Sequence, residues 1–336
     1  MIISKTPLRA SFFGGGTDFK DYYENGKYGY GTVLSTALNM YIYIVVNRRF
    51  DDKIRVCYTK NEFVDHVDQI QHNIIREALK IMGIENGIDI VYSADLPLSS
   101  AGVGLASSSA MAVGVLNALY AYKGLRVSAG ELAKGACEIE IERLHNPIGI
   151  QDQYAVAHGG FNQYKFWKDG KVTVSPVVCN KKVVQELKDS LMLFYTGITR
   201  VSSEILSEQK ESIGNKQELL DHMVEMAEEA YRVLAQGDIE KWGSMLDDAW
   251  IIKKQMASKI SNPVIEEMYQ TAKCAGARGG KILGAGGGGF LLLSVPRAKQ
   301  KNVRDALGQY KLVPFDFESE GSHIIFMEEN RLYEEM

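Results

Sequence analysis

The sequence is poor in the residues that mark several special classes of protein. Only 4 cysteines and 7 prolines occur in 336 residues. Cys57, Cys137, Cys179 and Cys274 lie far apart, and they form neither a Cys-x-x-Cys pair nor a metal-ligand pattern with histidine. We therefore expect four reduced cysteines within the core, with no disulfide framework and no structural metal.

Positive charge and long apolar runs are also scarce. The formal net charge is -4 at pH 7, so no basic field would attract nucleic acid or an anionic membrane. The N-terminal stretch MIISKTPLRASFF has no long apolar segment, and the longest apolar runs, such as residues 41–46, have the length of a strand. These absences favour a cytoplasmic protein with a small-molecule partner, and they leave a homodimer open.

What is present is typical of a globular protein. Hydrophobic residues make up 46% of the chain and charged residues 24%, and the length favours two domains. Strand-like segments and amphipathic helices mix in the first half, whereas after the strand-like SLMLFYTG the second half has successive helical patterns up to about residue 275. This arrangement predicts an α+β fold in both halves, with domains at 1–182 and 183–336.

Glycine is concentrated in three clusters, at residues 12–19, 101–110 and 276–290. None contains the G-x-x-x-x-G-K-[ST] pattern of a Walker-type P-loop. The third cluster matches G-x-G-x-x-G at Gly284, Gly286 and Gly289, but FLLLSVP follows it and predicts a strand. A dinucleotide site needs a helix at that point, so the match does not indicate an NAD-dependent oxidoreductase.

The second cluster has the context of a phosphate site. It precedes SSSAMAVGVLNALYAYKG, which predicts a helix of about four turns that ends at Gly124. The N-terminus of a helix offers unpaired N–H groups and a favourable dipole to an anion, and the serines at 107–109 suit capping or contact with Mg²⁺. A tight turn between two elements is the alternative for each cluster taken alone.

One acidic residue is predicted to point into the protein. Ser128 and Glu131 form a capping box that opens a helix over about 129–145. At about 100° per residue, Glu140 falls on the apolar side of that helix. A carboxylate in such a place needs a cation, so either an ion pair with Arg143 or a bound Mg²⁺ would explain it.

Asp152 follows in NPIGIQDQ, a turn shaped by glycine and proline. An aspartate in this position is commonly a helix cap. It could also accept a proton from a sugar hydroxyl.

The three clusters together resemble those of the GHMP kinases, named for galactokinase, homoserine kinase, mevalonate kinase and phosphomevalonate kinase. PLRASFFGGGTDF is similar to the first family segment, LPLSSAGVGLASSSA to the second, with Ala106 where a glycine is usual, and KILGAGGGGF to the third. The resemblance implies an N-terminal domain like ribosomal protein S5 domain 2, a ferredoxin-like C-terminal domain, and a site in the cleft between them. It also implies phosphorylation of a small alcohol by ATP.

The resemblance further implies roles for individual residues. Asp152 matches the catalytic acid that orients or deprotonates the substrate hydroxyl, and Arg9 matches the cation beside it. Ser108 and Glu140 match the Mg²⁺ ligands. The residues that would contact the nucleotide phosphates are Gly102, Gly104, Leu105, Ala106, Ser107, Ser108 and Ser109. Those that would contact substrate are Gly15, Gly16, Thr17, Asp18, Arg200, Gly286 and Gly287.

The first segment departs from the galactokinase pattern, which has Glu-His where Gly15 and Gly16 stand. FGGGTD together with YTGITRVSSEIL resembles the bacterial D-glycero-D-manno-heptose 7-phosphate kinases, which phosphorylate the anomeric hydroxyl to give the 1,7-bisphosphate. Arg200, Thr199 and Ser202 are then candidates to bind the sugar's phosphate, although TRVSSE also fits a helix cap. The alternatives are a kinase for fucose, a galactose-like sugar or an unphosphorylated heptose, and a non-catalytic relative that senses sugar.

Overall fold

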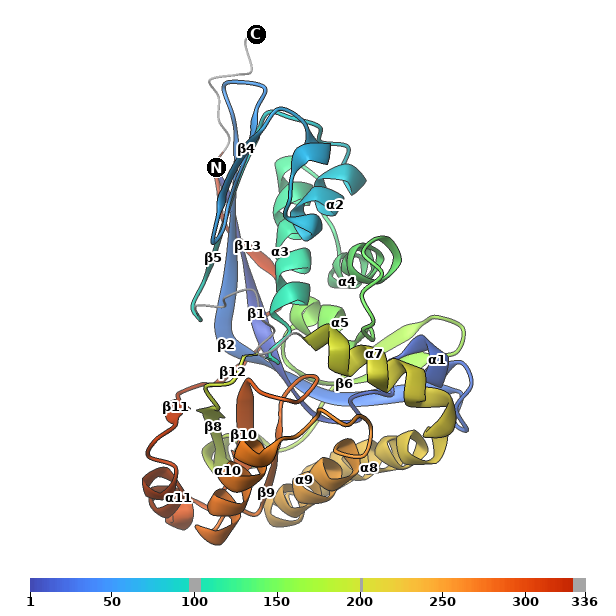
Figure 1. The fold of residues 1–336 in the computed structure, drawn as a ribbon, viewed down its shortest axis with the longest axis vertical. Coiled ribbons are helices and arrows are strands. Elements are labelled where there is room, and N and C mark those ends of the chain that lie inside the picture. Colours follow the sequence, from blue (N-terminus) through green and yellow to red (C-terminus); the bar gives the residue numbers. More distant parts are fainter. Residues whose placement is uncertain (97–103, 200–201, 329–336) are drawn as a thin grey trace.

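The computed structural model describes residues 1–96, 104–199 and 202–328. Two of the residues singled out from the sequence, Gly102 and Arg200, lie outside this part of the chain, and the side chain of Ser202 is not described. The described residues form two sheets with helices packed on them (Figure 1).

The first sheet has nine strands, arranged in the order β13-β1-β2-β5-β3-β4, with β6 and β12 also paired to β2 and β7 paired to β6. All pairings are antiparallel except that of β3 with β5. The strands span β1 (Ile2–Phe13), β2 (Tyr30–Arg48), β3 (Ile54–Cys57), β4 (Asn61–Val64), β5 (Ile88–Ala94), β6 (Phe161–Trp167), β7 (Val172–Pro176), β12 (Phe317–Glu318) and β13 (His323–Met327).

The long strand β2 connects the two ends of this sheet. Its first part pairs with β6 and its second part with β5. In the second part, buried Met40, Ile42, Ile44 and Val46 alternate with residues that are more exposed. That alternation gives the sheet one face toward a core, and helices cover it.

The helices of the first half lie on that face (Figure 1). The central one, α3 (Ser107–Tyr122), packs against β1 and β2, and it is buried over most of its length. Around it lie α2 (Asn73–Ile81), α4 (Ala129–Cys137) and α5 (Gln151–His158), while the short α1 (Lys20–Tyr23) follows β1. The segment predicted as a helix directly after the second glycine cluster is therefore the core helix of this half.

The second sheet is antiparallel in the order β11-β8-β10-β9, as in a ferredoxin-like domain. Its strands are β8 (Leu191–Tyr195), β9 (Gly279–Ile282), β10 (Phe290–Ser294) and β11 (Lys311–Val313). The accompanying helices are α6 (Lys181–Ser190), α7 (Ser202–Ser212), α8 (Gln217–Ala235), α9 (Ile239–Lys253), α10 (Pro263–Cys274) and α11 (Gln300–Ala306), with short 3-10 turns at Val67–Gln69, Ile213–Asn215 and Arg297–Lys299. The strand β10 directly follows the third glycine cluster, as the sequence predicts.

The chain returns to the first sheet at its end. β13 pairs with β1, and the main-chain groups of Met1 and Glu328 bond to each other at 2.9 Å. The division of the chain at 182 and 183 stays a prediction. These last strands are the part of 183–336 that backbone pairing joins to the first sheet.

Two local expectations are wrong. The predicted helix over 129–145 is α-helical only to Cys137, and it continues as a π-helical segment over Glu138–Arg143, which widens the turn by one residue. The four cysteines are all free, as expected, but they are not core residues. Three are half-buried and Cys274 is exposed. Cys57, Cys137 and Cys274 are the last residues of β3, α4 and α10, and Cys179 lies between β7 and α6.

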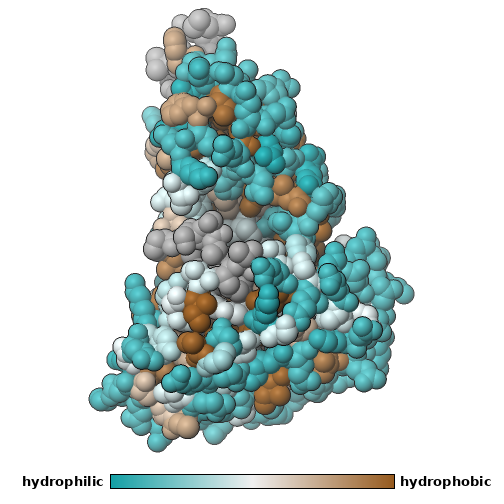
Figure 2. All heavy atoms as spheres, viewed as in Figure 1, coloured by the Kyte–Doolittle hydropathy of each residue, from teal (hydrophilic) through white to brown (hydrophobic). Residues whose placement is uncertain are grey.

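The face of the molecule in Figure 2 is mainly hydrophilic, with hydrophobic side chains in scattered groups. Among the described residues, no helix combines the length and the apolar character that crossing a bilayer requires.

Candidate active site

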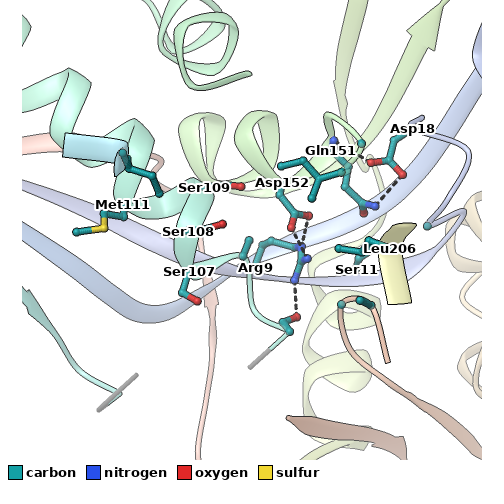
Figure 3. A pocket seen from close by; sticks show the side chains of 18 of the residues that line it. Arg9, Ser11, Asp18, Ser107, Ser108, Ser109, Met111, Gln151, Asp152 and Leu206 are labelled. Atoms are coloured by element: carbon teal, nitrogen blue, oxygen red, sulfur yellow. Dashed lines mark hydrogen bonds and ion pairs between the residues drawn. The ribbon is translucent and has the colours of Figure 1, made fainter. Parts of the chain in front are cut away.

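A cavity of about 580 Å³ lies where the two sheets meet. Residues from both halves of the chain line it, from β1, α3 and α5 on one side and from α7, α9 and β9 on the other. Figure 3 shows Arg9 and Asp152 near its middle, the serines of the second glycine cluster on one side, and Asp18 with Gln151 on the other. The three sequence clusters thus contribute to a single site.

Arg9 and Asp152 form a bidentate ion pair. The Arg9 Nε donates to Oδ1 of Asp152 at 2.8 Å, and a second guanidinium nitrogen donates to Oδ2 at 2.7 Å. The third nitrogen donates to the Gly104 carbonyl at 2.7 Å, so the arginine connects the phosphate loop to the acid. Arg9 is 3% exposed and the Asp152 side chain 26%. Asp152 is therefore held in one orientation while still facing the cavity, and it pairs with Arg9 rather than capping a helix.

The second glycine cluster turns sharply before α3. Gly104 and Ala106 both have left-handed backbone, with φ of 84° and 64°. Ala106 occupies the N-cap position of α3 and makes no capping hydrogen bond through its side chain, so of the two roles weighed for the serines, capping does not apply. A left-handed alanine is strained, which gives a physical reason for the glycine that is usual there. The serines at 107–109 line the cavity as the first turn of α3.

Glu140 is fully buried and points into the site. Its carboxylate accepts hydrogen bonds from the hydroxyls of Ser108 at 2.6 Å and Ser109 at 2.7 Å, and from the amide of Gln153 at 2.7 Å. Burial, and to a lesser extent the charge of Asp152, raise the pKa of Glu140, although its three hydrogen bonds oppose that rise. The inward orientation predicted from the sequence is confirmed.

The alternative partner for Glu140, Arg143, is engaged elsewhere. It donates to Glu138 at 2.8 and 2.9 Å and lies 3.7 Å from Glu77. Within the described chain, the recorded partners of Glu140 are neutral donors only. A buried carboxylate next to a serine hydroxyl at the edge of a cavity fits Mg²⁺, which takes few protein ligands and completes its shell with phosphate oxygens and water. No cluster of three or more metal-binding side chains occurs in the described part.

Asp18 defines the opposite end of the cavity. Its carboxylate accepts from the Gly16 amide at 3.0 Å, from the Gln151 amide at 3.1 Å and from the Gln151 side chain at 2.9 Å. Burial is the main cause that raises the pKa of Asp18, and the charge of Asp152 adds to it. The α5 helix thus carries both the acid at the centre and the glutamine that holds this second carboxylate.

Two buried polar atoms at this end have no hydrogen-bond partner among the described residues. They are the Ser11 hydroxyl and the Oε1 of Gln151. Both side chains line the cavity. An added Cβ on Gly15 would lie 3.7 Å from the Oγ of Ser11 and 3.7 Å from the Nε2 of Gln151. Buried polar atoms without a partner, in side chains that line a cavity, are consistent with a ligand that carries hydroxyl groups.

The third glycine cluster touches the second through its backbone. A Cβ on Gly284 would lie 2.4 Å from the Gly104 Cα, so both positions have to be glycine for the loops to approach. Gly284 and Ala285 line the cavity. Gly286 and Gly287 are not among the lining residues, and they pack on Ile260 instead. Their contact with substrate stays a prediction.

Two further residues of the candidate set are not among the residues that line the cavity. Thr17 is fully buried, and its hydroxyl donates to the carbonyls of Gly14 at 2.8 Å and Thr32 at 3.0 Å. Leu105 is also buried, and its carbonyl accepts from the Arg9 amide at 3.2 Å. These contacts show that both residues help to shape the loops, and their direct contacts with ligand stay a prediction. Position in a loop is readable from sequence, but side-chain direction is not.

The cavity extends past the serines to an aromatic and apolar end. Tyr58, His72, Ile74, Tyr92 and Met111 line it there. Tyr58 and His72 meet edge to face with centroids 4.8 Å apart. Sequence reasoning missed this end, because its residues come from four separate elements with no shared motif.

Two buried lysines were also missed. Lys253 donates to the carbonyls of Ile282 and Gly284, and Lys281 donates to the Phe12 carbonyl at 2.8 Å. Both line the cavity. A signal was available for Lys281, since it is the one charged residue of the segment GGKI, which is otherwise apolar.

Comparison with known proteins agrees with this architecture. The family model described as "GHMP kinases N terminal domain" matches residues 70–160, and that described as "GHMP kinases C terminal" matches residues 226–312. A D-glycero-alpha-D-manno-heptose 7-phosphate kinase from Campylobacter jejuni is 32% identical over 95% of this chain and 97% of its own. A galactokinase from Pyrococcus furiosus is 26% identical over 95% and 96%.

Solved structures lead to the same family. A structure described as a D-glycero-D-manno-heptose 1-phosphate kinase from Bacteriodes thetaiotaomicron has a TM-score of 0.80 at 25% identity, and the match covers 98% of this chain and all of that one. A putative sugar kinase from Campylobacter jejuni has a TM-score of 0.72 at 28% identity, over 96% and 97% of the two chains. The chain therefore belongs to the GHMP kinase family. More particularly, it is a sugar kinase that transfers a phosphoryl group from ATP to a hydroxyl.

Proposed function

We propose that the acceptor is D-glycero-D-manno-heptose 7-phosphate and that its anomeric hydroxyl receives the phosphoryl group, which gives the 1,7-bisphosphate. The observation that carries this proposal is the Asp18 end of the cavity. Gly15 and Gly16 place no side chain there, and the Ser11 hydroxyl and the Gln151 side-chain carbonyl lack the partners that the hydroxyls of a long polyol would supply. The similarity to the Campylobacter relative supports the same sugar.

The two ends of the cavity would hold the two substrates. The apolar end near Tyr92 and Met111 suits the adenine ring of ATP. The first turn of α3 then offers its N–H groups to the phosphates, and the sugar lies toward Asp18. This order puts the γ-phosphoryl group and the sugar hydroxyl beside Arg9 and Asp152.

The chain's own groups then act mainly by position and charge. Asp152 accepts the proton of the attacking hydroxyl, and the bidentate contact with Arg9 keeps its carboxylate aimed at that proton. Arg9 also offsets negative charge that develops during transfer. Ser108 and Glu140 would hold Mg²⁺, whose contribution is to neutralise the phosphate oxygens.

The partner of the sugar's own phosphate stays open to test. Arg200, the residue expected from the sequence, lies outside the described residues. The substrate test below is therefore repeated with Arg200→Ala, which asks whether Arg200 binds the phosphate of the sugar.

The direct experiment measures ADP release with D-glycero-D-manno-heptose 7-phosphate, unphosphorylated heptose, fucose, galactose and mevalonate. The heptose 7-phosphate should give a kcat/KM roughly 10- to 100-fold above the others, because a charged phosphate contact adds about 1.5–3 kcal/mol. Equal rates with phosphorylated and unphosphorylated heptose would contradict the 7-phosphate, and preference for fucose or galactose would replace heptose as the substrate.

Replacing Ser11 by alanine should separate binding from stability. We expect KM for the sugar to rise roughly 5-fold through loss of one hydrogen bond. The free protein should become slightly more stable, since the hydroxyl is buried without a partner in the described structure. Steady-state kinetics and thermal unfolding measure the two effects.

Ser294→Ala is the matched control for that prediction. Ser294 on β10 is also fully buried, and its hydroxyl has no partner among the described residues, but it does not line the cavity. Its alanine variant should gain similar stability and keep the wild-type KM. A KM for Ser11→Ala equal to that of the control would remove Ser11 from the sugar site.

A further inference from the structure

Lys281 is a buried cation in a place where a strand would ordinarily carry an apolar residue. All four residues of β9 are buried, and Lys281 is 3% exposed. Its Nζ reaches from the second sheet to the Phe12 carbonyl at the end of β1, at 2.8 Å. The side chain also lines the cavity, so it stands where the first and third glycine clusters come together.

The charges around Lys281 are unbalanced. Arg9 from β1 is the cation whose charge acts on it, and Arg9 is already neutralised by Asp152 from α5. Lys253 from α9 lines the same cavity. Glu140 and Asp18, the other carboxylates of the site, have recorded hydrogen bonds to Ser108, Ser109, Gln153, Gly16 and Gln151.

The recorded hydrogen bond of the Lys281 ammonium, within the described chain, goes to a neutral carbonyl, and no ion pair of this lysine is recorded there. Burial, and then the positive charge of Arg9, lower the pKa of Lys281 to about 7. A buried ammonium without a counter-ion is costly, and a cavity lined by such a group favours an anionic ligand. Two donor positions of the ammonium remain for that ligand.

We propose that Lys281 is a further catalytic residue, which contacts the transferred phosphoryl group beside Arg9 and gains its proton as the anionic substrates bind. This inference rests on the proposed kinase site, but not on the identity of the sugar. The loop geometry supports the proposal. A Cβ added to Gly104 would lie only 2.3 Å from the carbonyl oxygen of Leu283, which is two residues after Lys281. The turn that directly follows the strand of Lys281 is thus packed on the predicted phosphate loop.

The step remains balanced with Lys281 in this role. The bond between the γ-phosphorus and the oxygen of ADP breaks, and a bond to the sugar oxygen forms. The hydroxyl proton passes to Asp152. Lys281 keeps its proton throughout and offsets charge on the phosphoryl oxygens.

The pH profile distinguishes this role from a purely structural one. In the wild type, kcat/KM should fall as pH rises above about 7, because the free enzyme loses the Lys281 proton. Lys281→Arg should keep a cation at every accessible pH and lose that alkaline decline. Lys281→Met should lose the decline too, and its kcat/KM at pH 6.5 should fall roughly 10- to 100-fold.

Two readouts do not depend on turnover. At pH 8, calorimetry with the Mg²⁺ complex of a non-hydrolysable ATP analogue, which keeps the γ-phosphoryl group, in buffers of different ionisation enthalpy should show proton uptake by the wild type and none by Lys281→Met. In the free protein, the folded pKa of about 7 lies below that of an unfolded lysine, so the unfolded state binds more protons between these values. The thermal midpoint of the wild type should therefore rise with pH above 7 relative to that of Lys281→Met.

Lys216→Met is the matched control. Lys216 also donates to main-chain carbonyls, those of Gln255 at 2.8 Å and Met256 at 3.0 Å, but it does not line the cavity. Its variant should lose some stability while keeping the pH profile and proton uptake of the wild type.

The outcomes separate this inference from the proposed function. An alkaline decline that persists in Lys281→Arg, or turnover of Lys281→Met within about 3-fold of wild type, would reduce Lys281 to a bridge between the sheets. Wild-type activity on a different sugar would overturn the proposed substrate and leave the role of Lys281 intact. Proton uptake that is the same in wild type and Lys281→Met would overturn the coupling of protonation to substrate binding.

Discussion

Asp152→Asn should lower kcat by about 10²- to 10⁴-fold, the range of a general base, while the affinity for MgATP changes little. The amide cannot accept the hydroxyl proton, but it retains the size of the carboxylate and one acceptor for Arg9. The phosphate loop contacts Arg9 through the Gly104 carbonyl, which the substitution leaves in place. Steady-state kinetics and nucleotide titration measure the two properties separately.

Asp247→Asn controls for the loss of a half-buried ion pair. The Asp247 side chain is 28% exposed and pairs with Lys273 at 2.7 Å, and it also accepts from Tyr269, all in the second half of the chain. Like Asp152→Asn, this substitution removes the carboxylate of an ion pair, but the pair lies outside the cavity. We expect it to lower the unfolding temperature and leave kcat unchanged. Turnover of Asp152→Asn within a factor of ten of wild type would refute the assigned role.

Glu140→Gln should raise the Mg²⁺ concentration required for half-maximal activity by on the order of 10²-fold, since one charged ligand of the few that Mg²⁺ takes is lost. The variant should fold, because Gln153 can turn its unpartnered Oε1 toward the new amide. Burial raises the pKa of Glu140 above that of a glutamate in the unfolded chain. As the pH rises above the unfolded pKa, ionisation of Glu140 therefore lowers the stability of the folded wild type. The free variant should therefore be at least as stable as wild type at pH 7.

Nucleotide binding provides the second measurement for Glu140. MgADP should raise the melting temperature of the wild type more than that of Glu140→Gln, whereas ADP with EDTA should affect both alike. Glu138→Gln, two residues away in an exposed pair with Arg143, is the control and should behave as wild type. An unchanged Mg²⁺ titration in Glu140→Gln would return this residue to a structural role.

Much of the site was readable from local sequence because its residues stand within three short clusters. Arg9, Ser108, Glu140 and Asp152 each lie in or next to a motif, and the fold brings them together as expected. The inward direction of Glu140 followed from helical periodicity, although the helix is π-helical at that point. A wider turn shifts the angle by less than the width of the buried face, so the prediction survived the change.

What could not be read depends on contacts between segments far apart in the chain. Three features of the site depend on neighbours from other elements. They are the unpartnered Ser11 hydroxyl, the aromatic end around Tyr58 and His72, and the lysines of α9 and β9. The same limit affected Thr17, whose hydroxyl is used by the backbone of Gly14 and Thr32. The periodicity of a sequence predicts which side of a helix or strand is buried, but it does not predict which residues of other elements pack against that side.

The pairing of β13 with β1 also bears on how the protein is made. The first strand of the chain acquires this neighbour only after more than three hundred further residues have been synthesised. Until then, one side of β1 offers unpaired N–H and C=O groups, which is the kind of edge that invites association with another chain. Synthesis of β13, rather than emergence of the first half of the chain, is thus the event that closes this edge and protects the nascent enzyme from aggregation.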